Sequence, residues 1–162
     1  MSESAPIDIR ADAPYPSGAL SNFAPHAFTL DGVACASMEG FLQGLKLSDA
    51  AAQRQVCGLV GAEANRAGRQ HDWRASGLLW WQGRAIERRS PGYQRLLDRA
   101  YQALFEQSAS FRDALAASGD APLTHDHGRT DPGETVLTVE ELCSRLQMLR
   151  GGGSAGTGGR MR

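Results

Sequence analysis

The chain has 162 residues, of which 41% are hydrophobic and 22% are charged, and its formal net charge is −1. This length allows one domain with a substantial core, and the composition excludes a largely disordered or fibrous protein. The near-zero charge excludes a whole-chain electrostatic field that would attract nucleic acid, so such binding would need a local patch of basic residues.

Cysteine usage and the start of the chain indicate a cytoplasmic protein. Cys35, Cys57 and Cys143 are widely spaced and form no metal-like pair, which is typical of a reduced protein. The opening stretch MSESAPIDIR lacks the basic and apolar regions of a secretory signal. No stretch approaches the roughly 18 apolar residues that a membrane span needs, so no membrane partner is expected.

Glycine and polar residues at the two ends set the expected domain boundaries. Residues 1–13 are expected to be a flexible N-terminus, and residues 14–150 to be the folded domain. Residues 151–162, which read GGGSAGTGGRMR, are expected to be a disordered tail because they cannot bury enough surface to offset their ordering entropy.

The first predicted elements are a hairpin and two helices. Asp31-Gly32 is a two-residue hairpin signal between two short β-like runs. Ser37 is a suitable N-cap for a helix over residues 37–48, and Asp49 caps a second, alanine-rich helix.

The second half of the domain is also predicted to combine helices and short strands. Residues 61–68 favour a third short helix. The aromatic and β-branched residues on either side of Gly83 predict two strands joined by a turn at this glycine. Ser90 and Pro91 open a long amphipathic helix. A short strand follows near Leu123, and then Thr138-x-x-Glu141 forms a capping box for the last helix. The predicted fold class is therefore α+β, a mostly α-helical single domain with a few short strands.

The helix over residues 37–48 carries a polar row of Glu39, Gln43 and Lys46. Its spacing puts these three side chains on one face and the apolar residues on another. A plain amphipathic helix with a solvated polar face explains this pattern. The alternative is the floor of a site, in which a carboxylate near a helix N-terminus acts as a general base or stabilises a cation.

Each of the other candidate residues can have either a structural role or a role in ligand binding. Asn22 can form a turn or contact a ligand amide, and Phe23 can pack in the core or stack on a ring. Trp73 and Trp81 belong to a cluster of tryptophans that can pack in the core or stack on a base.

The sequence HDHG at residues 125–128 raises the question of a metal. A mononuclear site needs three or four ligands, and no third histidine or cysteine cluster accompanies His125 and His127. A polar loop that contributes Asp126 or a histidine to an organic-ligand site is the better interpretation. No metal is predicted.

Two motifs together resemble the NADAR family, also called YbiA-like. Its members have L-S-N-F before a hairpin and then a helix that opens S-x-E-x-[aromatic]-x-Q-x-x-K, and this chain has LSNF at 20–23 and SMEGFLQGLK at 37–46. The resemblance runs over roughly residues 17–150. Two positions depart from it: Gly40 stands where the family often has His, and HDHGRTDPG replaces a late D-x-x-W-G.

The resemblance implies a YbiA-like fold and an N-glycosidase. That family is associated with cleavage of riboflavin-pathway intermediates and with removal of ADP-ribose from guanine. The substrate implied here is an ADP-ribosylated base, free or on DNA or RNA, or a related ribosylphosphate, and no cofactor is needed.

In this interpretation Glu39 is the catalytic carboxylate, and Lys46 neutralises phosphate or assists the departing base. Asn22, Phe23, Gln43, Trp73, Trp81 and Asp126 bind the substrate. The alternatives are a non-catalytic module that binds ADP-ribose or an NAD derivative, and a partner-binding domain. The oligomeric state is left open.

Overall fold

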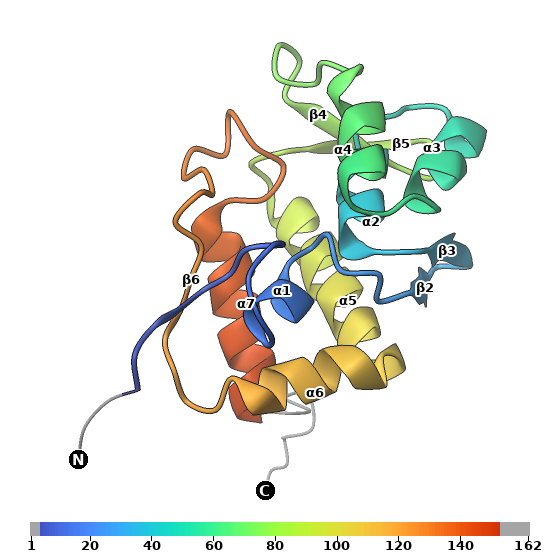
Figure 1. The fold of residues 1–162 in the computed structure, drawn as a ribbon. Helices are drawn as coiled ribbons and strands as arrows, with labels where there is room; N and C mark the ends of the chain where they lie inside the picture. The colour runs from blue at the N-terminus through green and yellow to red at the C-terminus, as the bar shows by residue number, and fades with distance from the viewer. Residues whose placement is uncertain (1–3, 153–162) are drawn as a thin grey trace, which may run out of the picture.

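Residues 4–152 are described by the structure, a computed structural model, and they form an α+β domain of mostly helices (Figure 1). The helices are α1 (Ser17–Leu20), α2 (Met38–Gly44), α3 (Ala50–Cys57), α4 (Gly61–Arg69), α5 (Pro91–Gln107), α6 (Ala109–Ala117) and α7 (Val139–Gly152). The strands are β1 (Ile7–Asp8), β2 (Phe28–Leu30), β3 (Val33–Cys35), β4 (Leu78–Trp81), β5 (Arg84–Glu87) and β6 (Leu123–Thr124). The predicted fold class is confirmed.

Two antiparallel hairpins match the turn signals in the sequence. Strands β2 and β3 pair around Asp31 and Gly32, whose φ angles are 50° and 80°. Strands β4 and β5 pair around Gln82 and Gly83, whose φ angles are 51° and 85°. Positive φ at both central residues is the conformation that matches the twist of the flanking strands.

The third strand pair corrects the predicted N-terminal boundary. Strand β1 runs parallel to β6, with Ile7 opposite Leu123, and the next residue, Ile9, is only 1% exposed. Residues 4–13 therefore belong to the fold, and the prediction that residues 1–13 form a flexible end is wrong for them. At the other end α7 extends to Gly152, so the predicted tail at 151–162 begins inside a helix and otherwise lies outside the described residues.

The predicted helix caps are present with hydrogen-bonding geometry. Ser37 Oγ accepts from the Gly40 N–H at 3.0 Å, and an Asp49 carboxylate oxygen accepts from the Ala52 N–H at 2.8 Å. Such caps satisfy N–H groups that the helix itself leaves without acceptors. The other two predicted caps are also formed: Ser90 Oγ accepts from Tyr93 N–H, and Thr138 and Glu141 bond reciprocally.

Helix α2 ends earlier than the sequence predicts. The expected helix over residues 37–48 stops at Gly44, and Lys46 lies in the turn that follows. The Leu45 carbonyl accepts a hydrogen bond from the Trp80 N–H of β4 at 2.7 Å instead of continuing the helix. The close approach of β4 is thus the tertiary reason for the early end.

The long amphipathic helix predicted to open at Ser90 and Pro91 is α5, and a second helix, α6, follows it after one residue. Ser108 is both the C-cap of α5 and the N-cap of α6, and its hydroxyl accepts from the Phe111 N–H at 3.1 Å. Because a serine side chain competes for nearby backbone N–H groups, it favours a break of this kind.

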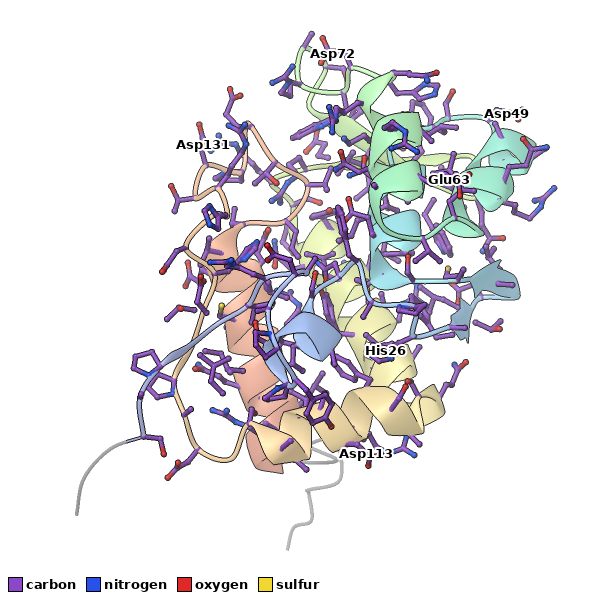
Figure 2. The ribbon with its side chains drawn as sticks, viewed as in Figure 1. His26, Asp49, Glu63, Asp72, Asp113 and Asp131 are labelled. Atoms are coloured by element: carbon purple, nitrogen blue, oxygen red, sulfur yellow. The ribbon has the colours of Figure 1, made fainter. Side chains whose placement is uncertain are left out.

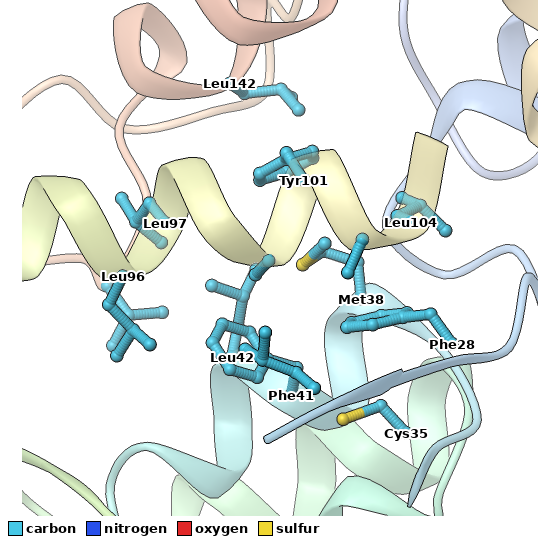
Figure 3. Close-up of a cluster of buried hydrophobic side chains, with 14 of the residues drawn as sticks. Phe28, Cys35, Met38, Phe41, Leu42, Leu96, Leu97, Tyr101, Leu104 and Leu142 are labelled. Carbon is cyan, nitrogen blue, oxygen red and sulfur yellow. The ribbon is translucent and has the colours of Figure 1, made fainter. Parts of the chain in front are cut away.

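Helix α5 runs through the centre of the hydrophobic core. Leu96, Leu97, Tyr101 and Leu104 project from it between α7 on one side and α2 with the first hairpin on the other (Figure 3). Tyr101 is only 1% exposed. This arrangement sets α2 against a rigid support.

Close packing explains why glycine stands at position 40, where the family that the chain resembles often has histidine. A Cβ atom at this position would lie 2.6 Å from the carbonyl oxygens of both Cys57 and Leu59. Both oxygens belong to backbone, which cannot rotate away as a side chain can. The loop after α3 therefore packs against α2 at a distance that only glycine permits.

We expect Gly40→Ala to lower the free energy of unfolding by about 1–3 kcal/mol, the usual range for an overpacked interior. Chemical denaturation of the two proteins measures this difference. Gly151→Ala is the matched control, because a Cβ there would meet nothing within 4 Å. An equal loss of unfolding free energy in both variants would show that close packing at Gly40 is not the cause.

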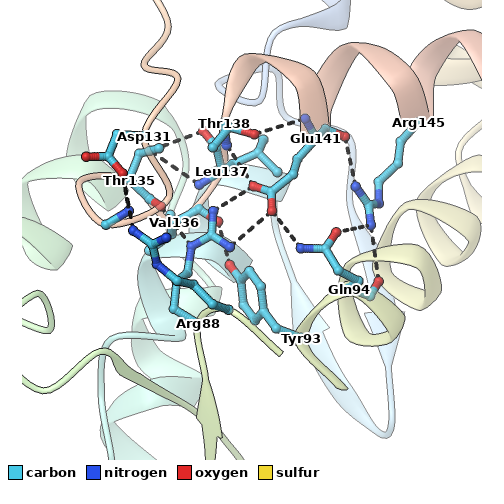
Figure 4. Close-up of polar contacts among 12 residues, drawn as sticks. Arg88, Tyr93, Gln94, Asp131, Thr135, Val136, Leu137, Thr138, Glu141 and Arg145 are labelled. Carbon is cyan, nitrogen blue, oxygen red and sulfur yellow. Dashed lines mark hydrogen bonds and ion pairs between the residues drawn. The ribbon is translucent and has the colours of Figure 1, made fainter. Parts of the chain in front are cut away.

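A buried polar network joins β5, α5 and α7 (Figure 4). Arg88 is 2% exposed and donates two hydrogen bonds to the Glu141 carboxylate, at 3.0 and 2.7 Å. Its Nε donates to the Thr135 carbonyl at 2.9 Å, and its guanidinium lies 4.7 Å from the Tyr93 ring centroid. The network ties the loop between β6 and α7 to the body of the domain.

Membrane insertion finds no support in the helices. Within residues 4–152, none is both long and apolar enough to span a bilayer.

Candidate functional site

A cavity of about 320 Å³ lies between residues 9–12 after β1, the LSNF segment, α2, α7 and the start of the β6–α7 loop. Its wall includes Asn22 and Phe23 from the loop after α1, and Glu39 from α2. His125 and His127 come from the segment that follows β6. Three of these residues, Asn22, Phe23 and Glu39, are among the predicted site residues.

Glu39 is a buried carboxylate on this wall, with 8% of its surface exposed. Its Oε2 accepts hydrogen bonds from Gln43 Nε2 at 2.7 Å and from Asn65 Nδ2 at 3.2 Å. Its Oε1 has no hydrogen-bond partner among residues 4–152. The carboxylate is therefore held at one oxygen and available at the other.

The support for Glu39 comes from the close contact of α2 with α4. Gln43 is 6% exposed, and its amide lies against Gly68, where a Cβ would be 1.8 Å from Gln43 Oε1. Gln43 does not line the cavity. It orients the carboxylate from behind, together with Asn65, which belongs to no motif that the sequence shows.

Asn22 and Phe23 are placed by hydrogen bonds and packing. The Tyr101 hydroxyl donates to Asn22 Oδ1 at 2.8 Å, which leaves the Asn22 NH₂ group as a donor. The Asn22 carbonyl accepts from the Glu39 N–H at 3.0 Å, so the loop and α2 keep a constant separation. Phe23 is half-buried, and a Cβ at Gly61, at the start of α4, would lie 3.5 Å from its ring.

The rim of the cavity carries charge. Arg10 pairs with Asp12 at 3.3 Å, and the Arg10 guanidinium holds the pKa of the Asp12 carboxyl below its usual value. His127 is exposed on the same rim and also lowers the pKa of Asp12. These groups give the entrance a cationic side chain and hydrogen-bonding partners for a polar ligand.

Lys46 lies beyond the end of α2 and is not part of the cavity wall. Burial lowers the pKa of its ammonium group, Glu39 raises it, and the neighbouring Arg74 and Arg69 lower it further. Lys46 therefore lies close enough to Glu39, Arg69 and Arg74 for their charges to affect it. Its role in a reaction stays a prediction.

Trp81 and Trp73 lie in the core, and their stacking on a ligand stays a prediction. Trp81 is 6% exposed, donates from Nε1 to Asp31 at 2.8 Å and packs edge-on against Phe41, with ring centroids 5.2 Å apart. Trp73 is also 6% exposed and joins the same core. Neither ring lines the cavity.

Asp126 is outside the cavity wall, and its contact with a ligand stays a prediction. Its side chain is exposed, its N–H donates to Asp8 at 2.7 Å, and it borders a neighbouring hollow along α7 instead of the cavity. The residues on either side of it, His125 and His127, line the cavity. His125 also borders the neighbouring hollow, so it lies between the two.

No three histidine, cysteine, aspartate or glutamate side chains gather as a metal-ligand set within the part of the chain that the structure describes. Acidic side chains such as Asp49, Glu63, Asp72, Asp113 and Asp131 are spread over the surface (Figure 2). The arrangement around Glu39 instead suits an uncharged or cationic organic group held by amides, a carboxylate and an aromatic ring.

Residues 14–151 match the family described as Bacteriophage protein GP30.3. The chain is 40% identical over 148 residues to a protein of Enterobacteria phage T4 described as an uncharacterized 17.1 kDa protein in the Gp30–rIII intergenic region, a match that covers 89% of this chain and 96% of that one. The NMR structure of the E. coli protein YbiA is similar, with a TM-score of 0.64 and 20% identity over 100% of this chain and 92% of that one. At this identity the likeness to YbiA shows the fold alone, and the fold is YbiA-like.

Proposed function

This chain belongs to the Bacteriophage protein GP30.3 family, and we propose that it is an N-glycosidase that hydrolyses a ribosyl C–N bond. The substrate is the ADP-ribose conjugate of a base such as guanine, free or on nucleic acid, or a related ribosylphosphate. The observation that carries the proposal is Glu39, a buried residue of the cavity wall whose Oε2 is held by two amide groups while its Oε1 has no partner among residues 4–152.

The chemistry of the bond suits a buried carboxylate. Cleavage of a ribosyl C–N bond passes through an oxocarbenium-like state, which a nearby negative charge stabilises. The same carboxylate can take a proton from the attacking water, and a positioned general base typically contributes about 10²- to 10⁴-fold. Glu39 can perform both roles without a metal or redox cofactor.

The size of the cavity limits what it encloses. A volume of about 320 Å³ is at the small end of ligand pockets, which run from about 300 to 1,000 Å³. The ribose and base are therefore enclosed beside Asn22 and Phe23, and the phosphates extend over the rim. Arg10 on the rim, or Lys46 with Arg69 and Arg74 on the α4 side, would bind those phosphates.

The deciding experiment incubates the purified protein with guanosine-linked ADP-ribose, free and on DNA, and with a riboflavin-pathway ribosylphosphate. Mass spectrometry follows the free base and the free sugar phosphate. Release of the base from only one of these substrates identifies which of the two substrate classes the protein hydrolyses. Thermal stabilisation by ADP-ribose without release from any of them would instead support a binding module, and neither effect would support a partner-binding domain.

A further inference from the structure

His125 occupies the wall of the same cavity as Glu39, on a different element of the fold. We propose that His125 Nε2 donates the proton that the departing base requires. This inference rests on the proposed function, because it assigns the second proton transfer of the hydrolysis to a residue of this chain.

The tautomer of His125 is determined by a backbone contact. Its Nδ1 lies 2.8 Å from the Ile9 carbonyl oxygen, 116 residues away in sequence. A carbonyl oxygen only accepts, so Nδ1 carries a hydrogen in every protonation state of the ring. Nε2 is therefore the nitrogen that gains and loses a proton, and it has no hydrogen-bond partner among the described residues.

The ring is also held sterically. The Gly128 N–H donates to the His125 carbonyl at 2.9 Å, closing a turn. A Cβ at Gly128 would lie 2.4 Å from His125 Cδ2, so the ring edge packs directly on the glycine backbone. The parallel pairing of β1 with β6 places Ile9 opposite this turn. His125 thus has the fixed orientation that a proton donor needs.

The other groups near the cavity suit this role less well. Arg10 is paired with Asp12, and a guanidinium does not release its proton near neutral pH. His127 is exposed on the rim, and Lys46 is not part of the wall. His125 is the half-buried group on the cavity wall whose ring is oriented by a backbone carbonyl and whose Nε2 has no partner among residues 4–152.

The oxygen of water bonds to C1′ and gives a proton to Glu39, while the C1′–N bond breaks with its electron pair on the base nitrogen. That nitrogen takes the proton from His125 Nε2. Glu39 then loses its proton to solvent and His125 regains one, which leaves a free base and a ribose hydroxyl.

The test compares two leaving groups on the same sugar phosphate. His125→Asn keeps a donor near the Nδ1 position but removes the acid. The substitution should lower kcat for release of the nitrogenous base by about 10²-fold or more. With a 4-nitrophenyl ribosylphosphate, whose phenolate leaves without a proton, we expect a change of less than about threefold. His71→Asn, an exposed histidine on the loop after α4, is the matched control and should leave both rates unchanged.

Each outcome has a distinct meaning. Equal losses of kcat on the two substrates would overturn the proton donor and leave the proposed hydrolysis intact. No release by wild type from either substrate would overturn the hydrolysis and the donor together. If His125→Asn folds poorly, His125→Ala with added imidazole replaces it, and recovery confined to the nitrogenous base is the expected result.

Discussion

Glu39→Gln is expected to reduce release of the free base by about 10²- to 10⁴-fold, the usual contribution of a positioned general base. Glutamine has nearly the same shape but cannot accept the proton of water or stabilise positive charge at C1′. Two amide groups already donate to Oε2, so the altered side chain would be tethered near its original place. The loss should therefore appear in kcat, measured by quantifying the base.

Glu63→Gln is the matched control for this substitution. Glu63 lies exposed in the first turn of α4, away from the cavity wall (Figure 2). It should retain the wild-type rate. If Glu39→Gln and wild type released base at the same rate, Glu39 would have no part in the chemistry. A change in affinity for ADP-ribose without turnover in either protein would favour the binding module.

Arg88→Leu is expected to lower the free energy of unfolding by about 3–5 kcal/mol, because it leaves the partner carboxylate buried without its counter-charge. The side chains of Arg88 and Glu141 are 3% and 13% exposed, and their closest N–O distance is 2.7 Å. Urea denaturation measures the loss. The double variant Arg88→Leu/Glu141→Leu should recover part of it, since no unpaired charge then remains.

Arg89→Leu provides the control one residue away. Its guanidinium lies 3.4 Å from Asp131, and the two side chains are 67% and 60% exposed. Exposed pairs of this kind contribute about 0–1 kcal/mol, so the variant should unfold almost as wild type does. A loss as large as that of Arg88→Leu would show that burial is not what makes the Arg88 pair important.

The same pair makes stability depend on pH. Burial raises the pKa of Glu141, but hydrogen bonds from Arg88, Thr138 and Gln94 together lower it below its ordinary value of 4.5. A carboxyl with a depressed folded-state pKa stabilises the fold above its unfolded pKa, and that stabilisation disappears as pH falls through the folded value. Wild type should therefore lose unfolding free energy below about pH 4.5, and Arg88→Leu should lose less over that range. Parallel pH profiles for the two proteins would contradict this.

The Arg88 network also bears on the candidate site. It anchors the loop between β6 and α7 through the Thr135 carbonyl and the first turn of α7. That loop begins with His125 and His127, which line the cavity. Destabilising the network should therefore loosen one wall of the site while leaving Glu39 on α2 in place.

Local signals in the sequence were enough to predict much of this protein. Helix caps, glycine turns and the spacing of apolar residues act between neighbours in the chain, so the two hairpins and most helix starts were predictable. Glu39, Asn22 and Phe23 belong to short motifs, and the structure brings these three together at the cavity.

The remaining parts depended on contacts between distant segments. β1 is defined only by its pairing with β6, and the same pairing brings His125 to Ile9. The early end of α2, which separates Lys46 from the cavity, depends on the Trp80 N–H of β4. The spacing within a motif cannot show such contacts, because they arise only when elements far apart in sequence pack. The sequence alone therefore singled out Glu39, Asn22 and Phe23 as candidates, whereas only the tertiary structure brought His125 and His127 to the same cavity, through the pairing of β6 with β1.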